Sequence, residues 1–165
     1  MKTIIFIRHA KSSWKFLELT DFERPLNKRG KRNAPEMALR LDNLGIQPDL
    51  IVSSSAVRAK MTATYFAELL NYPIPTIQEV DKIYEATVSD VFEVIEKLQD
   101  NKDIVLLFGH NPTFTMIANH FSNTPIANIP TCGMFGVEFK TEKWKNFTES
   151  QSNFLFFDYP KNSDS

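Results

Sequence analysis

The chain of 165 residues has one cysteine, no excess of either charge and no long apolar run. A lone thiol cannot form an internal disulfide, and without companion thiols it supplies neither a zinc cluster nor a redox pair. We therefore expect Cys132 to be a buried or half-buried apolar residue. Nineteen basic and 20 acidic residues leave a formal charge of -1, which argues against nucleic acid as a partner. Any attraction for phosphate must be local.

The first residues, MKTIIFIRHAK, hold only a short apolar stretch before Arg8. A secretory signal or a membrane span needs a much longer one, so we expect a protein of the reducing cytoplasm with no membrane contact. Three scattered histidines lack the spacing of metal ligands. We therefore expect neither a metal nor another cofactor.

The length suits one domain, and 42% apolar residues are enough for its core. Strands are predicted over 3–7, 49–53, 75–79 and 104–108, and helices over 27–44, 55–70, 87–98 and 112–121. Two last strands, 133–139 and 154–159, have a shorter connection that permits antiparallel pairing.

This alternation predicts an α/β domain: a three-layer α/β/α sandwich whose central sheet is mostly parallel with an antiparallel edge. We expect residues 1–160 to form the domain and residues 161–165 to form a frayed polar tail. Pro35 falls inside the first helical segment, so that helix either kinks there or begins its regular part nearby.

Candidate functional residues follow three of the predicted strands. Arg8 and His9 end the first strand, Arg58 opens the helix after the second, and His110 follows the strand at 104–108. Ligands of open α/β sheets bind beyond the carboxyl ends of the strands. If these strands are neighbours, two arginines and two histidines converge, and they repel one another unless an anion lies between them. A phosphoryl group fits, because the planar guanidinium matches paired phosphate oxygens and the helix start adds amide donors.

Each of these residues also has a structural alternative when taken alone. Arg8 would end a strand, His9 would be a satisfied histidine at the rim, and Arg58 would be an ordinary residue at a helix start. His110 is the least ordinary, because a tight turn presents its side chain at the rim. If all of these structural alternatives hold, the placement of such residues after three separate strands is a matter of three coincidences. In the functional alternative, positive surroundings lower the pKa of His9 and leave one ring nitrogen nucleophilic at neutral pH.

The segments FIRHAKSSW, DFERPLNKRG, SSSAVRAKMTA, IYEA and FGHNP occur in this order between Ile5 and Pro112. They resemble the ordered blocks of SixA-type phosphohistidine phosphatases in the phosphoglycerate mutase-like, or histidine phosphatase, superfamily. The resemblance covers nearly the whole chain and implies a phosphoglycerate mutase-like fold and a metal-independent phosphatase. By this resemblance His9 is the phosphorylated nucleophile, while Arg8, Arg58 and His110 hold the phosphoryl oxygens. One departure is Ala10, where the superfamily usually has glycine.

The proton donor is less clearly indicated. Glu85 in IYEA is the best candidate for protonating an alkoxide leaving group, and its alternative is an ordinary loop glutamate. Ser12 and Ser13 are candidate phosphoryl-binding residues, although a solvated loop explains them equally well. Asp21 and Arg24 are interpreted as a structural ion pair that pins the loop after the first strand.

The expected reaction is hydrolysis through a covalent phosphohistidine at His9, with phosphohistidine on a signalling protein of the histidine-phosphotransfer type as the preferred substrate. A phosphohistidine protonated on its other nitrogen leaves as neutral imidazole, so it needs little acid catalysis. Small phosphate esters are the next substrate class. The alternatives are a mutase or small-metabolite phosphatase of the same superfamily, for which the chain is short, and a phospho-binding module without turnover.

Overall fold

The computed structural model describes residues 1–161, so the last four residues of the predicted tail, 162–165, lie outside the described residues. Within residues 1–161, four α-helices alternate with six strands. They are β1 (Lys2–Arg8), α1 (Lys28–Asn43), β2 (Leu50–Ser54), α2 (Val57–Leu69), β3 (Gln78–Val80), α3 (Val88–Glu96), β4 (Ile104–Gly109), α4 (Thr113–Phe121), β5 (Met134–Phe139) and β6 (Ser152–Asp158). Every predicted strand and helix is present, with its ends shifted by at most a few residues.

The six strands form one sheet in the order β3-β2-β4-β1-β5-β6. The first four are parallel, whereas β5 pairs antiparallel with both β1 and β6. The predicted antiparallel edge is thus confirmed. Strand β4 lies between β1 and β2, with Arg8 of β1 opposite Gly109 of β4. The three strands that precede the candidate residues are therefore neighbours, and their carboxyl ends share one rim.

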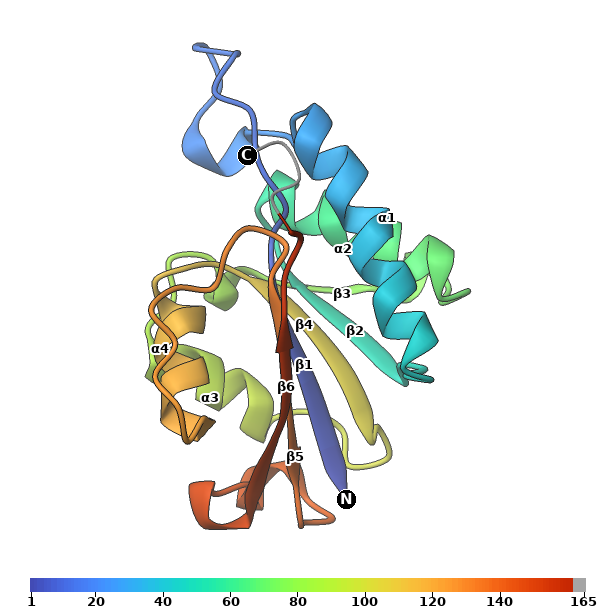
Figure 1. The fold of residues 1–165 in the computed structure, drawn as a ribbon, viewed down its shortest axis with the longest axis vertical. Helices are drawn as coiled ribbons and strands as arrows, with labels where there is room; N and C mark the ends of the chain where they lie inside the picture. The colour runs from blue at the N-terminus through green and yellow to red at the C-terminus, as the bar shows by residue number, and fades with distance from the viewer. Residues whose placement is uncertain (162–165) are drawn as a thin grey trace.

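Helices α1 and α2 cover one face of the sheet, and α3 and α4 cover the other (Figure 1). Side chains alternate along β1: Ile4 and Phe6 pack toward α3 and α4, while Ile5 and Ile7 pack toward α1 and α2. Each of the four is fully buried, and burial of such a side chain stabilises the fold by about 1.5–3 kcal/mol. The predicted three-layer sandwich is confirmed. None of the helices within residues 1–161 has the length and apolar character needed to cross a bilayer.

Helix α1 is anchored at its start to the segment that follows β1. The Asn27 side chain caps the helix by accepting a hydrogen bond from the backbone amide of Gly30, and the backbone amide of Asn27 donates to the Lys11 carbonyl. Gly30 lies so close to the same carbonyl that an added Cβ atom would be 2.2 Å from its oxygen. Pro35 lies inside the helix and does not mark its beginning. The start of α1 is therefore held in place beside the chain just after His9.

Gly30→Ala tests this close approach. Replacing a glycine inside a helix by alanine normally stabilises it by about 1 kcal/mol. Here the new methyl group would overlap the Lys11 carbonyl, so we expect destabilisation by about 1–3 kcal/mol in urea denaturation. Lys31→Ala, on the exposed side of the same helix, should change the free energy of unfolding by less than about 0.5 kcal/mol. A more stable Gly30→Ala protein would show that α1 does not contact Lys11.

Candidate active site

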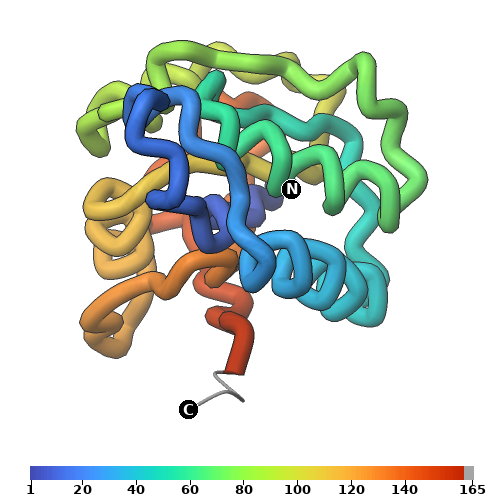
Figure 2. Tube along the Cα trace, turned by 90° about the horizontal axis from the view of Figure 1, so that it is seen from above, coloured from blue at the N-terminus to red at the C-terminus, as the bar shows by residue number. Residues whose placement is uncertain are grey.

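The carboxyl ends of β1 and β4 and the first turn of α2 form the rim that Figure 2 shows from above. The rings of His9 and His110 lie there with centroids 5.2 Å apart. Arg58 donates from Nε to Nε2 of His9 at 3.4 Å. Arg8 contributes a second guanidinium, whose charge lowers the pKa of both histidines. The structure thus brings together the four residues that the sequence predicts to converge, while their catalytic roles stay predictions.

The hydrogen bonds of His9 fix which ring nitrogen carries the proton. Its Nδ1 lies 2.7 Å from the carbonyl oxygen of Ala10, and because a carbonyl only accepts, Nδ1 is the donor and Nε2 keeps its lone pair. Burial lowers the pKa of His9 to about 3; the Ala10 hydrogen bond opposes this shift, and the charges of His110, Arg58 and Arg8 add to it. At neutral pH His9 is therefore a neutral imidazole whose Nε2 lone pair faces Arg58 Nε.

Two buried nitrogens at this rim, Arg8 Nε and His110 Nδ1, have no hydrogen-bond partner within residues 1–161. The other ring nitrogen of His110 lies 2.7 Å from the Ser54 hydroxyl. Burial, with the charges of Arg58 and Arg8, lowers the pKa of His110 to about 4, against the opposing charge of Asp21. A buried donor or acceptor without a partner costs about 1–3 kcal/mol. An oxyanion bound among the cations would supply acceptors for such groups.

Asp21 holds Arg58 in place, a contact that the sequence analysis did not predict. Its Oδ2 accepts from Arg58 Nη2 at 3.0 Å and from the Tyr84 hydroxyl at 2.6 Å, and its backbone carbonyl accepts from Arg58 Nη1 at 2.7 Å. The predicted ion pair with Arg24 is confirmed, at 2.9 Å. Burial raises the pKa of Asp21, but hydrogen bonds from Tyr84 and Arg24 and the charge of Arg58 outweigh it and hold the pKa well below its usual range. Asp21 is therefore an anion that binds the far end of Arg58, whose Nε faces His9.

Tyr84 connects this network to His110. Its ring makes an edge contact with the ring of His110, with centroids 5.6 Å apart, and another with Phe22 at 5.0 Å. Burial and the hydrogen bond to Asp21 raise the pKa of Tyr84 to about 12, so the hydroxyl stays a donor. Tyr84 lies in the IYEA block. The sequence of that block does not predict the hydrogen bond from the Tyr84 hydroxyl to Asp21, which lies in the loop after β1.

The two candidate serines make contacts within that loop. Ser12 is buried and its hydroxyl accepts from Arg24 Nη1 at 2.6 Å. The Ser13 hydroxyl accepts from the backbone amide of Lys15 at 3.1 Å. These contacts position the loop, and they leave binding of a phosphoryl group by either serine as a prediction.

Glu85 lies on the His110 side of the site. It is exposed, and it lines a hollow of about 260 Å³ together with His110 and Asn111. Its backbone φ of 54° is left-handed, which is uncommon for a residue other than glycine. The structure therefore places this carboxylate near the candidate site, while its role as proton donor stays a prediction.

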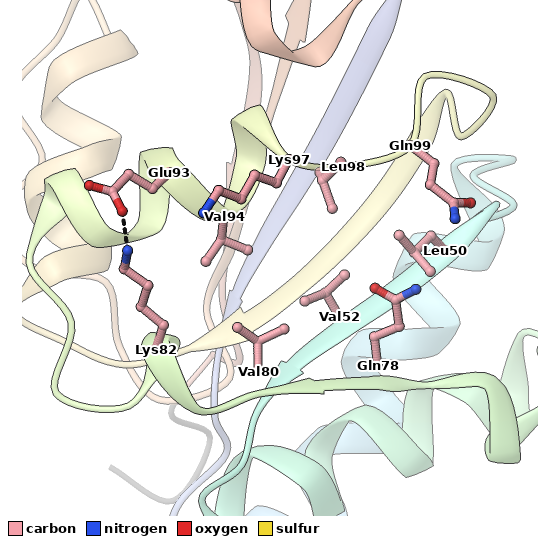
Figure 3. Close-up of a pocket in the computed structure, with 10 residues that line it drawn as sticks. All are labelled: Leu50, Val52, Gln78, Val80, Lys82, Glu93, Val94, Lys97, Leu98 and Gln99. Carbon is pink, nitrogen blue, oxygen red and sulfur yellow. Dashed lines mark hydrogen bonds and ion pairs between the residues drawn. The ribbon is translucent and has the colours of Figure 1, made fainter.

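A larger apolar hollow lies elsewhere, between α3 and the strands β2 and β3 (Figure 3). It measures about 380 Å³, and Val52, Val80 and Val94 line it, with the Lys82–Glu93 ion pair at one side. None of the candidate residues lines this hollow. Although this hollow is larger, it therefore takes no part in the chemistry proposed for the histidine rim.

Comparison with known proteins agrees with this geometry. The family model of the histidine phosphatase superfamily (branch 1) matches residues 4–87, a segment that includes Arg8, His9 and Arg58. The chain belongs to the histidine phosphatase superfamily. A chloroplastic protein of Arabidopsis thaliana, itself uncharacterized, is 32% identical over an alignment of 140 positions that covers 79% of this chain. The chain spans 63% of the length of that relative.

Among solved structures, the chain resembles SixA proteins over nearly its full length. The putative phosphohistidine phosphatase SixA from Agrobacterium tumefaciens superposes with a TM-score of 0.81 at 25% identity, covering 96% of this chain and 98% of the other. The protein histidine phosphatase SixA complexed with tungstate also gives 0.81, at 19% identity, covering 97% and 98%. The phosphoglycerate mutase-like fold and the resemblance to the SixA type are thus confirmed.

The lowered pKa values of the two histidines predict how stability changes with pH. In the unfolded chain a histidine has a pKa of about 6.5, against about 3 for His9 and about 4 for His110 in the fold. Between these values the unfolded state binds more protons, so stability falls as the pH falls below about 6.5. From pH 7 to pH 5 we expect a loss of up to about 2 kcal/mol for each histidine.

Urea denaturation at the two pH values measures this loss. His110→Gln removes one of the two titrating groups and should therefore lose less stability than the unmodified protein over the same interval. An equal loss in both proteins would contradict the neutral, buried state of His110.

Proposed function

We propose that the chain is a phosphohistidine phosphatase that transfers the phosphoryl group first to His9 and then to water. One observation carries the proposal: the neutral Nε2 of His9 lies 3.4 Å from Arg58 Nε, within a cluster that also contains Arg8 and His110. A neutral nucleophile surrounded by fixed positive charge suits attack on an anionic phosphorus centre.

In the first step the lone pair of His9 Nε2 attacks phosphorus in line with the leaving group. The new P–N bond forms as the bond to the leaving group breaks, and the leaving group departs with that electron pair. Arg8, Arg58 and His110 donate to the phosphoryl oxygens as charge shifts onto them. The Ala10 carbonyl, which accepts a hydrogen bond from Nδ1–H of His9, stabilises the positive charge that develops on the ring.

In the second step water attacks phosphorus, the P–N bond breaks and His9 is restored with the release of phosphate. The substrate decides how much acid catalysis the first step needs. Phosphohistidine protonated on its other nitrogen leaves as neutral imidazole and needs no strong acid. An ester leaves as an alkoxide that must be protonated, and we propose Glu85, which shares a hollow with His110, as that donor.

The preferred substrate is a phosphohistidine on a signalling protein. The full-length structural similarity to SixA proteins supports this choice. Small phosphate esters are the second candidate, and the position of Glu85 beside His110 favours them. We further propose that residues 1–160 act as one domain in the cytoplasm. No metal is needed in this mechanism, because Arg8 and Arg58 supply the positive charge on the phosphoryl oxygens.

A trapped intermediate tests the covalent step. Brief exposure to a ³²P-labelled phosphate ester, followed by denaturation, should give label on the protein that survives alkali and is lost in acid, as a phosphoramidate is. His9→Ala should abolish the label, because the attacking nitrogen is gone. His120→Ala, which removes the histidine of α4 outside the site, should label like the unmodified protein.

The covalent role of His9 and the independence from metal can be contradicted by separate results. Label that persists in His9→Ala, or that resists acid, would contradict the covalent role of His9. Loss of activity on addition of a chelator, with no inhibition by vanadate, would contradict a metal-independent transfer.

Asp21→Asn tests how strongly the site depends on the position of Arg58. The amide keeps the size of the carboxylate but removes its charge, so Arg58 loses its ion pair at 3.0 Å. We expect kcat for a small ester to fall by about 10- to 100-fold, since a misplaced donor to a transition-state oxygen costs about that much. Glu23→Gln, two residues away on the exposed side of the loop, should keep kcat within about twofold. A normal kcat in Asp21→Asn would show that Asp21 has no positioning role.

A further inference from the structure

The loop between β1 and α1 exposes four large apolar side chains within nine residues. Trp14, Phe16, Leu17 and Phe22 are 69%, 43%, 92% and 37% exposed. Single exposed apolar residues are ordinary, whereas several of them within one short loop indicate an interaction site. The loop projects beyond the carboxyl ends of the parallel strands (Figure 1), where the histidine rim lies.

Hydrogen bonds hold the base of this loop. Ser12 and Leu26 form an isolated antiparallel bridge, and the Ser13 amide donates to the Pro25 carbonyl at 2.8 Å. The guanidinium of Arg24 stacks on the ring of Trp14 at 3.6 Å from its centroid. Trp14 is thus fixed before any partner binds, and an aromatic side chain fixed in this way loses little conformational entropy on binding.

The same loop borders the candidate active site through a continuous series of contacts. Arg24, which stacks on Trp14, pairs with Asp21 at 2.9 Å, and Asp21 pairs with Arg58 at 3.0 Å. Arg58 in turn reaches His9. A protein that covers the exposed face of Trp14 would therefore lie next to the phosphoryl-binding rim.

The charge of this region differs from that of the rest of the chain. Residues 11–32 contain seven Lys or Arg and three Asp or Glu, a net charge of +4 in a chain of net charge -1, which leaves -5 for the remainder. Lys15, Lys28 and Lys31 are exposed and form no ion pair with any residue in 1–161. An acidic partner surface complements this region, whereas an anionic bilayer would also meet the negative remainder of the molecule.

We propose that residues 13–22, together with Lys28 and Lys31, form a docking surface for the phosphorylated protein substrate. The partner that fits is an acidic protein surface with an apolar depression beside its phosphorylated side chain. Leu17 and Trp14 enter the depression, and the lysines meet the surrounding carboxylates. This inference rests on the proposed phosphatase function and names what selects a protein substrate over a small ester.

Paired substrates separate docking from chemistry. The probes are p-nitrophenyl phosphate and an acidic histidine-phosphotransfer domain phosphorylated on its histidine. Leu17→Ser should lower kcat/KM for the phosphoprotein by about tenfold, as loss of an apolar anchor does, and keep that for p-nitrophenyl phosphate within about twofold. The double variant Lys28→Glu, Lys31→Glu should lower the phosphoprotein value similarly and weaken its dependence on ionic strength.

Matched changes elsewhere serve as controls. Leu44→Ser replaces an exposed leucine at the far end of α1, and Lys140→Glu reverses a charge at the opposite end of the sheet, after β5. Both should leave the two kcat/KM values unchanged.

Four outcomes would overturn the inference. The first is an unchanged phosphoprotein kcat/KM in Leu17→Ser while the unmodified protein hydrolyses both probes. The second is an equal fall for both substrates, which would place Leu17 in the chemistry. The third is Leu17-dependent binding to phosphatidylserine vesicles with unaltered phosphoprotein kinetics, which would make the loop a membrane contact. The fourth is an unmodified protein that hydrolyses neither probe, which would refute the proposed function and the docking surface with it.

Discussion

A neutral imidazole kept next to guanidinium groups is the constraint on which the rest of the site depends. His9 can attack phosphorus only while Nε2 holds a lone pair, and a solvated histidine would be partly protonated near neutral pH. Burial at the end of β1 and the neighbouring cations disfavour protonation, and the Ala10 carbonyl holds the remaining proton on Nδ1. The position of β4 between β1 and β2 gathers these groups at one rim.

The cations that suit an anionic substrate would repel one another in its absence, and Asp21 offsets part of that repulsion. Its carboxylate binds Arg24 and Arg58 on the side away from His9 Nε2 and also accepts from Tyr84. The loop after β1 therefore has two connected tasks. It fixes the guanidinium of Arg58 in the site, and through Arg24 it contacts Trp14 on the surface, so that the proposed substrate docking and the proposed phosphoryl binding depend on the same short segment.

Periodic features of the chain could be predicted from sequence, and contacts made by loops could not. The alternating apolar runs predicted the strands and helices. Because ligands of open α/β sheets bind beyond the carboxyl ends of the strands, the positions of Arg8, His9 and His110 after predicted strands also predicted that they lie at one rim. The pairing of Asp21 with Arg24, three residues away, could be predicted. Its pairing with Arg58 could not, because an irregular loop has no periodic pattern from which its path can be inferred. The tautomer of His9 likewise depends on a carbonyl whose direction only the folded backbone determines.

A crystal structure of the protein with orthovanadate tests the central claim most directly. The account predicts vanadium bonded to Nε2 of His9, with Arg8, Arg58 and His110 donating to its equatorial oxygens and with Nδ1 of His9 still bound to the Ala10 carbonyl. Vanadate bonded to another residue, or bound at a distance from His9 without contacts to both arginines, would contradict it.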